Sequence, residues 1–337
     1  MKIIFISLLW LVILIASHAG DISKPDKYDK KMAWPVIIAT QSNPVAEVMK
    51  KENYFVIHAG GKGTEVKTKV DKYLKQLATR YHIDPMRIYA TSFSRGGHEV
   101  LLQTMNNPHM FAAIAPVCND LRSGPYVNYV KYLNNNPTLF IHGSRDSFRA
   151  TAKKLMKTML DAGCIVEWKD YEGGHTPKPL FNKDMSPILS FFRKHKFNPY
   201  PKKIEHVVNH KRYARSFWTQ GWPIEDKGNL GAIYKVEVKE GNKIEVTANE
   251  KISVVMLLLN KNIIDMDKEL IVTSGEKVMF KGKPKERIDL KFRDSKISYT
   301  KIYPVLWEEL EKIRQEKWGI EKIDALEALE PLEKEKK

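Results

Sequence analysis

Two hydrophobic patterns divide the 337-residue chain. In the first part, continuous apolar runs such as Pro35–Thr40 and Tyr54–His58 alternate with stretches of helical period such as Val66–Tyr81. Strands that are apolar throughout and alternate with helices predict a parallel sheet covered on both faces. In the later part the period becomes two, as in Ala232–Val238, and Gly241-Asn242 is a hairpin turn signal. Several short strands with turns between them predict a small antiparallel β-sandwich there.

The patterns predict four segments along the chain. A targeting segment over residues 1–19 precedes an α/β catalytic domain over residues 20–198. A β-sandwich-like domain over residues 199–300 follows, and residues 301–337 form C-terminal helices and a charged tail. We place the boundary between the two domains at Asn198–Lys202, because this stretch contains two prolines and breaks both patterns.

The N-terminal segment has the features of a cleavable signal peptide. Lys2 precedes an apolar run from Ile3 to Ala16, and Ser17 and Ala19 are small residues at the two positions that a signal peptidase reads. We expect cleavage after Ala19 and a secreted or periplasmic protein. An uncleaved anchor is the alternative, although the run is short for a membrane span.

Charge and cysteine content narrow the possible partners. A net charge of +16 at pH 7 would suit an anionic partner, but the charge is scattered and no basic nucleic-acid-binding motif is present. We therefore expect a solvated lysine-rich surface, no nucleic-acid partner and no stable membrane insertion. Cys118 and Cys164 would lie at opposite ends of the sheet, which predicts two free thiols. With so few cysteines and no tight His/Asp cluster, we expect no metal site.

The sequence around Ser94 predicts a strand, a sharp turn and a helix. A short apolar run ends at Ser92-Phe93-Ser94-Arg95-Gly96, and a helical stretch follows from Gly97 to Met105. Such a turn exposes one serine in front of a helix N-terminus, which favours negative charge. The positions two before and two after the nucleophile must be small, because strand and helix nearly touch. Gly96 meets this need, whereas Ser92 stands where glycine is usual.

An acid and a histidine follow the serine in loops after strand-like runs. Thr138–Asp146 is an apolar strand with a polar loop, and Val166–Tyr171 leads to His175. A serine nucleophile needs a base and a group that orients the base, so these residue types in this order suit nucleophilic catalysis. Asp120 also follows a strand and is the alternative acid, but the loop of Asp146 precedes a clearer helix.

Other polar residues near these motifs are interpreted as structural. His98 and His109 flank the helix after Ser94 and are expected at the surface or in packing. His142 lies in the strand before Asp146 and is expected to be structural. Glu172 is close to His175 in sequence, where it would either tune the histidine or face solvent as an ordinary loop acid.

The stretch from about Pro25 to Pro201 resembles one branch of the α/β-hydrolases, the esterases and prolyl-oligopeptidase-related enzymes, including polyhydroxybutyrate-depolymerase-like esterases. The residues that carry the resemblance are Arg87-Ile-Tyr89 before the turn, Phe111–Pro116 after it, and the two loops that hold Asp146 and His175. The resemblance implies an α/β-hydrolase fold and a catalytic triad, often followed by a C-terminal β-domain.

Residue by residue, the resemblance implies Ser94 as nucleophile, Asp146 as orienting acid and His175 as base, with no cofactor. Hydrolases of this fold normally begin with an antiparallel hairpin. Because only about a dozen residues separate the targeting segment from the lead-in to the first predicted strand, we expect a sheet trimmed at that edge, with about six strands.

The predicted oxyanion hole departs from the family pattern. Relatives place His-Gly after the strand equivalent to Pro35–Thr40, where this chain has Gln41-Ser42. The backbone amide of Arg95 supplies one donor by position, and we expect the second from Gln41 or its neighbour. A rival interpretation takes His58–Gly61 as the oxyanion loop. Loss of one donor typically lowers the rate by ~10²–10³, so the departure bears on efficiency.

Two aromatic groups are candidate ligand contacts. Tyr126 and Tyr129 would either form a rim on an acyl pocket or pack a short helix. Phe217-Trp218 and Trp222 would either form a platform of the kind seen on carbohydrate-binding modules, with possible glycan contact, or belong to the core of the β-domain.

These observations predict an exported serine hydrolase, specifically a carboxylic-ester hydrolase that acts through an acyl-enzyme on a small-molecule or polymeric ester. The first alternative is a serine peptidase of the prolyl-oligopeptidase-related type. The second is a glycan- or surface-binding protein with an inactive hydrolase domain.

Overall fold

The computed structural model describes residues 22–40, 52–119, 121, 125–181, 184–225, 231–295, 299 and 301–319. The targeting segment, Gln41, Ser42 and Asp120 lie outside these ranges, so the expectations about them stay predictions. Among the described helices, none is both long and apolar enough to cross a membrane.

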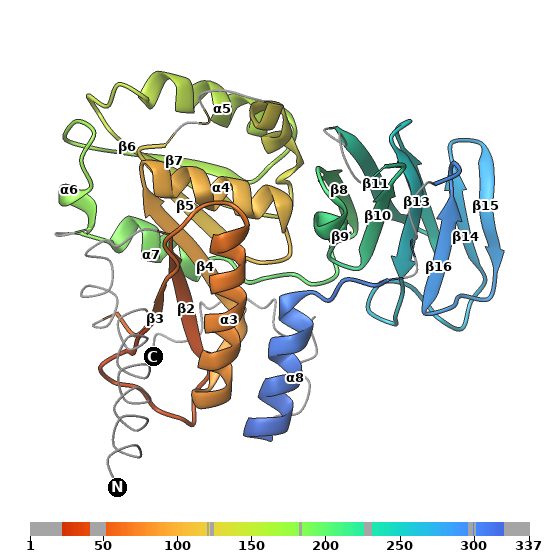
Figure 1. Ribbon diagram of the computed structural model, residues 1–337, viewed down its shortest axis with the longest axis horizontal. Helices are drawn as coiled ribbons and strands as arrows, with labels where there is room; N and C mark the ends of the chain where they lie inside the picture. Colours follow the sequence, from red (N-terminus) through yellow and green to blue (C-terminus); the bar gives the residue numbers. More distant parts are fainter. Residues whose placement is uncertain are drawn as a thin grey trace, which may run out of the picture.

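A seven-stranded, mostly parallel sheet forms the first part of the chain (Figure 1). Its strand order is β1-β3-β2-β4-β5-β6-β7, and only the edge strand β1 runs antiparallel to its neighbour. The expected six strands are thus one too few, because the trimmed edge keeps a strand of two residues. The strands are β1 (Ile22–Ser23), β2 (Trp34–Ala39), β3 (Phe55–His58), β4 (Ile83–Phe93), β5 (Ala113–Val117), β6 (Thr138–Gly143) and β7 (Val166–Tyr171).

Helices cover both faces of this sheet. One face packs against α3 (Thr64–Arg80), α4 (Arg95–Asn106) and α5 (Arg149–Asp161), and the other against α6 (Lys178–Phe181) and α7 (Ser186–Arg193). Successive strand residues point to opposite faces, so Ile37 joins the α6–α7 core and Ile38 joins the α3–α5 core. The sheet order and the two helical layers define an α/β-hydrolase fold.

The sequence from Leu180 to Lys194 predicts a single helix that closes the first domain, but the structure has two short helices there, α6 and α7. A proline at the start of α7 explains why the helix begins afresh there, since proline fits the first helical turn but not the interior.

The later part of the chain is a sandwich of two sheets. One has the strand order β16-β13-β10-β9 and the other β15-β14-β12-β11-β8. The predicted all-antiparallel pairing is wrong at one position, because β12 and β14 are parallel. The strands are β8 (Lys203–Val208), β9 (Arg215–Ser216), β10 (Thr219–Pro223), β11 (Ala232–Lys239), β12 (Lys243–Ala248), β13 (Ile252–Leu258), β14 (Leu270–Ser274), β15 (Lys277–Gly282) and β16 (Arg287–Lys291).

The aromatic residues considered as a ligand platform are all buried. Phe217 and Trp218 belong to the core of this sandwich, whereas Trp222 lies on the other face of β10, against Tyr303, at a ring-centroid distance of 5.6 Å. Phe217, Trp218 and Trp222 are at most 4% exposed, and the Trp218 indole N–H donates to the Pro201 carbonyl at 2.9 Å. Rings buried in this way offer no face to a sugar, which contradicts the platform interpretation. Glycan contact through another surface of the sandwich stays a prediction.

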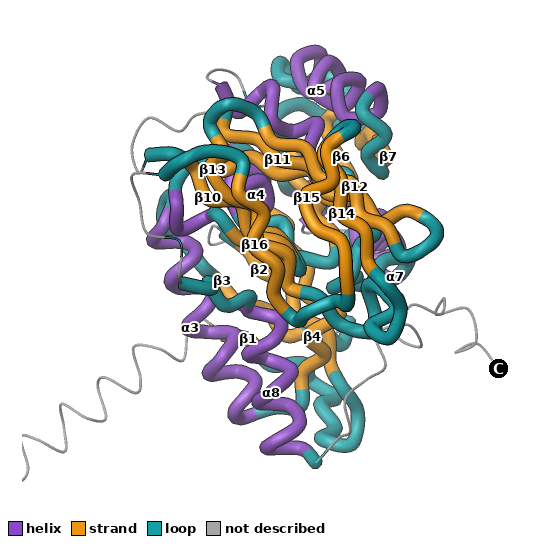
Figure 2. Tube along the Cα trace, turned by 90° about the vertical axis from the view of Figure 1, so that its right-hand side faces the viewer, coloured by secondary structure: helices purple, strands orange, loops and turns teal. Residues whose placement is uncertain are grey.

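A final helix, α8 (Leu306–Trp318), returns from the sandwich to the first part of the chain. It lies beside α3 in both views (Figures 1 and 2). The Trp318 indole donates to the Ala78 carbonyl at 3.3 Å, and Lys75 pairs with Glu309 at 2.9 Å. At the start of α8, the Trp307 indole nitrogen lies 3.0 Å from the Met86 sulfur.

Strand β4 carries an unsatisfied hydroxyl near its end. Ser92 is fully buried, and its Oγ finds no hydrogen-bond partner among the described residues. The adjacent Thr91 is equally buried, but its Oγ1 donates to the Ala115 carbonyl at 2.7 Å. An unpaired hydroxyl in an apolar interior opposes folding, whereas a paired one does not.

We therefore expect Ser92→Ala to raise the free energy of unfolding by roughly 1 kcal/mol, because it removes a desolvated polar group at little loss of volume. Thr91→Val is the matched control and should lower it by roughly 1 kcal/mol through loss of a buried hydrogen bond. Urea unfolding measures both. Equal losses in the two variants would contradict the idea that Ser92 is unpaired.

Candidate active site

Ser94 occupies a strained turn between β4 and α4. Its φ is 51° and its ψ is −118°, a conformation that residues with a side chain rarely adopt. The Ser94 amide donates to the Val117 carbonyl at 2.8 Å, and the Ser94 carbonyl accepts from Asn119 Nδ2 at 3.0 Å. These contacts with the end of β5 hold the turn, so the Ser94 side chain is set at the carboxyl edge of the sheet.

Close packing behind the turn requires glycine at Gly97. A Cβ at this position would lie 2.9 Å from the Asn119 Cβ and 3.1 Å from the Ser92 carbonyl oxygen. Sequence reasoning singled out Gly96 alone, and the second glycine of the pair was the signal for this contact. Gly96 takes part in a different way, because its carbonyl accepts from Thr40 Oγ1 at 2.7 Å.

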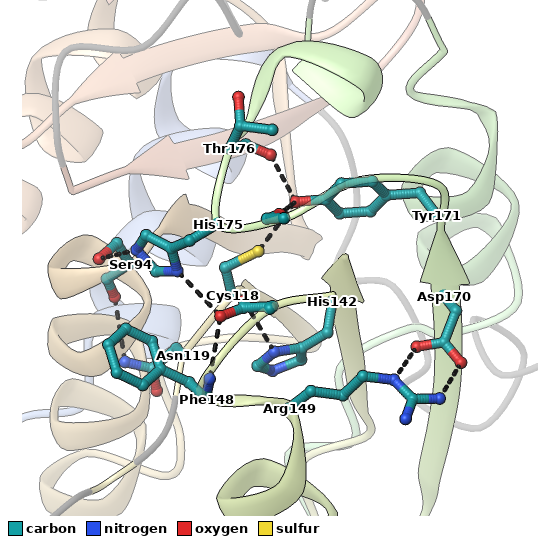
Figure 3. A network of polar contacts seen from close by, with 12 residues as sticks. Ser94, Cys118, Asn119, His142, Phe148, Arg149, Asp170, Tyr171, His175 and Thr176 are labelled. Carbon is teal, nitrogen blue, oxygen red and sulfur yellow. Dashed lines mark hydrogen bonds and ion pairs between the residues drawn. The ribbon is translucent and has the colours of Figure 1, made fainter. Parts of the chain in front are cut away.

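The structure brings the three predicted triad residues together, and Figure 3 shows the side chains of Ser94 and His175 pointing toward each other. Ser94 Oγ lies 2.9 Å from His175 Nε2, and His175 Nδ1 lies 3.2 Å from Asp146 Oδ1. The three residues follow β4, β6 and β7, whose carboxyl ends meet at one edge because the strands are parallel. The His175 side chain remains 32% exposed, and its ring is flanked by Phe93 and Phe148 at centroid distances of 4.8 Å.

The loop that carries His175 is fixed by backbone contacts to β6. Gly143 has no room for a side chain, since a Cβ there would lie 2.3 Å from the Gly174 carbonyl oxygen. The Arg145 amide donates to the Gly173 carbonyl at 2.8 Å. The Tyr171 hydroxyl, at the end of β7, donates to the Thr176 carbonyl. The loop is therefore held on both sides of His175.

Asp146 is a buried carboxylate with several donors. Its Oδ1 accepts from the Phe148 amide at 3.0 Å in addition to its contact with His175. Burial tends to raise the pKa of Asp146, but the neighbouring Cys118 thiol and the hydrogen bonds from the Phe148 amide and His175 outweigh it and lower the pKa below its usual value. Asp146 is therefore ionised at neutral pH and can orient the imidazole of His175.

His142 contacts the same carboxylate, which sequence reasoning did not foresee. Its Nδ1 lies 3.2 Å from Asp146 Oδ2, and the side chain is fully buried. The ring stacks on Trp168 with a centroid distance of 4.9 Å and an interplanar angle of 7°. The signal in the sequence was the spacing, because the histidine lies one residue before the end of β6 and the loop after this strand carries the acid, four residues beyond the histidine. Asp146 thus bridges two histidines.

One group of side chains among the described residues could hold a metal ion. It consists of Cys118, His142 and Asp146, whose ligand atoms lie within 4.8 Å of one another. Burial raises the pKa of the Cys118 thiol to about 12, so it stays protonated and is a poor ligand. We interpret the group as a hydrogen-bonded support for Asp146. Cys118 and Cys164 are both free and buried, as the sequence predicted.

The oxyanion side of the site is described in part. Arg95 is the first residue of α4, and amides of the first helical turn have no partner within the helix. The predicted second donor, Gln41, lies outside the described residues. Two observations favour the loop after β2 over the rival His58–Gly61 loop. Thr40, which follows β2, donates a hydrogen bond to the Gly96 carbonyl of α4, the helix that starts after Ser94. The rival loop follows β3, and β2 lies between β3 and β4 in the sheet.

The contacts of the remaining predicted residues are with other parts of the structure. Tyr126 and Tyr129 belong to a 3₁₀ helix over Pro125–Tyr132, where their rings meet edge to face at 6.3 Å and pack against the α3–α5 core. This packing supports the second interpretation of these tyrosines, and a substrate contact stays a prediction. Glu172 pairs with Arg145 on the surface, in agreement with an ordinary loop acid.

Comparisons with known proteins add structural neighbours only. No protein-family model matches the chain, and no curated protein matches it in sequence. Among solved structures it is similar to a thermostable esterase (17% identity, TM-score 0.40, covering 52% of this chain and 58% of that one). It is also similar to a ferulic acid esterase (17% identity, TM-score 0.41, covering 49% of this chain and 86% of that one). A third similar structure is the Pyrococcus horikoshii acylaminoacyl peptidase (15% identity, TM-score 0.42, covering 52% of this chain and 39% of that one). The chain thus spans 58% and 39% of the first and last of these, and likeness at this level does not define an activity.

We expect substitutions of His142 to separate its hydrogen bond from its packing. His142→Phe keeps a ring against Trp168 but leaves Asp146 Oδ2 without a donor, so the free energy of unfolding should fall by about 1–3 kcal/mol. His142→Asn places an amide N–H near the position of Nδ1 and should lose less. Chemical unfolding at pH 7 compares them, and a more stable Phe variant would contradict the hydrogen bond.

The depressed pKa of Asp146 predicts a pH-dependent contribution to stability. A carboxyl with a lowered folded-state pKa stabilises the fold above its unfolded value, about 3.9, and this contribution is lost as pH falls through the folded value. Cys118→Ala removes a neighbouring polar group that lowers the pKa of Asp146, so it should raise that pKa. The stability gap between wild type and variant should then narrow between pH 5 and pH 3. The cavity left by the substitution acts equally at all pH values, so a constant gap would contradict the role of the thiol.

Proposed function

We propose that the protein is an exported serine hydrolase that cleaves carboxylic esters through an acyl-enzyme. The observation that carries the proposal is the 2.9 Å contact between Ser94 Oγ and His175 Nε2, with Asp146 on the other imidazole nitrogen. A nucleophile, a base and an orienting acid at these separations are the arrangement that activates serine. Export rests on the N-terminal segment, with cleavage after Ala19.

In the proposed reaction, Ser94 Oγ attacks the ester carbonyl carbon while His175 Nε2 takes the serine proton. The backbone amide of Arg95 and a second amide near Gln41 stabilise the negative oxygen. The C–O bond of the ester then breaks, and the alcohol leaves with the proton from His175. Water, deprotonated by His175, releases the acid and restores Ser94. Asp146 keeps the imidazole in the tautomer whose Nε2 accepts the proton.

The local structure supports an ionised acid and an accessible base. The side chain of Asp146 is fully buried and is held by donors, whereas the side chain of His175 remains 32% exposed and open to a substrate. A peptidase acting through the same residues is the alternative. A panel of matched esters and amides distinguishes the two, because amide cleavage demands more help for the leaving group.

A fluorophosphonate probe tests the proposal directly. We expect wild-type protein to react covalently, and Ser94→Ala to lose labelling, since only an activated serine attacks such a probe at a useful rate. Ser92→Ala is the matched control. It removes the neighbouring serine of the same motif, which is fully buried, and should label as wild type does.

Absence of labelling in folded wild-type protein would overturn the enzyme proposal and favour a binding protein with an inactive hydrolase domain. Labelling that survives in Ser94→Ala but is lost in Ser92→Ala would show that the assignment of Ser94 as the nucleophile is wrong. Intact-protein mass spectrometry reads both outcomes, because each covalent adduct adds a defined mass.

A further inference from the structure

The acid of the candidate triad has two oxygens, and each has its own partners. Asp146 Oδ1 accepts from the Phe148 amide at 3.0 Å and lies 3.2 Å from His175 Nδ1. Oδ2 lies 3.2 Å from His142 Nδ1, and Figure 3 shows the two imidazoles approaching one carboxylate. The side chains of His142 and Asp146 are both fully buried. Bulk solvent therefore offers Oδ2 no substitute for the histidine.

The charge of Asp146 decides the direction of the hydrogen bond with His142. Burial opposes ionisation, but the polar neighbours of Asp146 outweigh it and lower its pKa, so at neutral pH the carboxylate can only accept. His142 therefore carries a hydrogen on Nδ1 and donates it to Oδ2. His175 donates to Oδ1 in the same way, which leaves its Nε2 to accept the proton of Ser94.

The two histidine contacts together fix the rotation of the carboxylate. The last torsion of an aspartate side chain has only broad preferences, so hydrogen bonds have to set it. Donors on Oδ1 alone hold one oxygen, and the plane of the group can still tilt. A second donor on Oδ2 holds the plane as well. The lone pair that faces His175 then keeps one direction.

His142 is itself held by the neighbouring strand. Its ring stacks on Trp168 of β7 with a centroid distance of 4.9 Å and an interplanar angle of 7°. The Trp168 indole N–H donates to Asp170 Oδ1 at 3.0 Å, and Lys153 Nζ lies 5.4 Å from the centroid of the indole ring. The direction of the His142 N–H is therefore set by β6 and β7, and not by the loop that carries the acid.

We propose that His142 is a positioning residue of the hydrolytic site, whose Nδ1–H holds the Asp146 carboxylate in the rotation that aligns His175 with Ser94. Because His142 is fully buried, it acts through Asp146 and not on a substrate. The inference rests on the proposed hydrolase function and deepens it. An aligned carboxylate stabilises the imidazolium that forms when His175 takes the serine proton. Loss of the alignment should therefore slow the chemical step and leave substrate binding nearly unchanged.

Three substitutions at His142 separate the hydrogen bond from the packing. His142→Asn places an N–H near Nδ1 but loses the stack on Trp168. His142→Phe keeps a ring there without an N–H, and His142→Leu, close to Asn in size, has neither. We expect the rate of fluorophosphonate labelling, and kcat for 4-nitrophenyl acetate, to fall about tenfold or more in the Phe and Leu variants. The Asn variant should keep most of both rates, and KM should change little in all three.

His206→Phe controls for a loss of stability without a loss of alignment. His206 of β8 is also a buried histidine, 1% exposed, and its Nε2 lies 2.7 Å from the Tyr213 carbonyl oxygen. The substitution removes a buried hydrogen bond in the sandwich, so it should lower the free energy of unfolding and leave the labelling rate unchanged. A folded His142→Phe or His142→Leu variant that labels at the wild-type rate would overturn the positioning role. So would an Asn variant as slow as the Leu variant.

Proton NMR distinguishes failure of this inference from failure of the hydrolase proposal. An imidazole N–H bound to a carboxylate gives a low-field signal, and Ser94→Ala keeps both histidines, so the measurement needs no activity. In that variant we expect signals from His142 and His175. Adding His142→Phe should remove the first and shift or broaden the second, whereas an unchanged His175 signal would overturn the inference. Folded wild-type protein that is not labelled would overturn the hydrolase proposal, and the His175 signal would still decide whether His142 directs the acid.

Discussion

The candidate site depends on one strained peptide turn. Ser94 keeps a positive φ because its backbone amide donates to the Val117 carbonyl at the end of β5 and its carbonyl accepts from the side chain of Asn119. Gly97 lets the helix approach closely enough for these contacts to form. If the turn relaxed, the serine would leave the edge of the sheet where the loops after β6 and β7 end. The strained backbone of Ser94 and the parallel order of the strands are therefore both needed to bring the serine next to the loops after β6 and β7.

The second constraint is the cost of burying a charge. Asp146 is removed from water, which would favour its neutral form, yet it is held by hydrogen bonds with His142 of β6, with His175 and with the Phe148 amide of its own loop. Each donor also fixes the direction of the carboxylate. The polar group around the Asp146 carboxylate is thus larger than the three candidate triad residues and includes Cys118 and His142, which no comparison of motifs would single out.

Local patterns predicted the α/β part well, because its strands are apolar runs and its helices have clear periods. Ser94, Asp146 and His175 were identified by residue type and order, and the structure brings their side chains together. The sandwich was harder to predict. Strand β9 has two residues and β10 contains glycine and proline, so neither shows a period. The parallel pairing of β12 with β14 and the burial of Trp222 depend on distant segments, which no local window contains.

Helix α8 has a consequence for the order in which the chain can complete its fold. Its contact with α3 joins residues 240 positions apart, with the whole sandwich between them. Contacts of such sequence separation form late, since the loop they close must first be ordered. During synthesis the outer side of α3 stays uncovered until the sandwich has left the ribosome. During synthesis the α/β part of the chain therefore exposes, for a time, the surface of α3 that α8 covers in the complete protein.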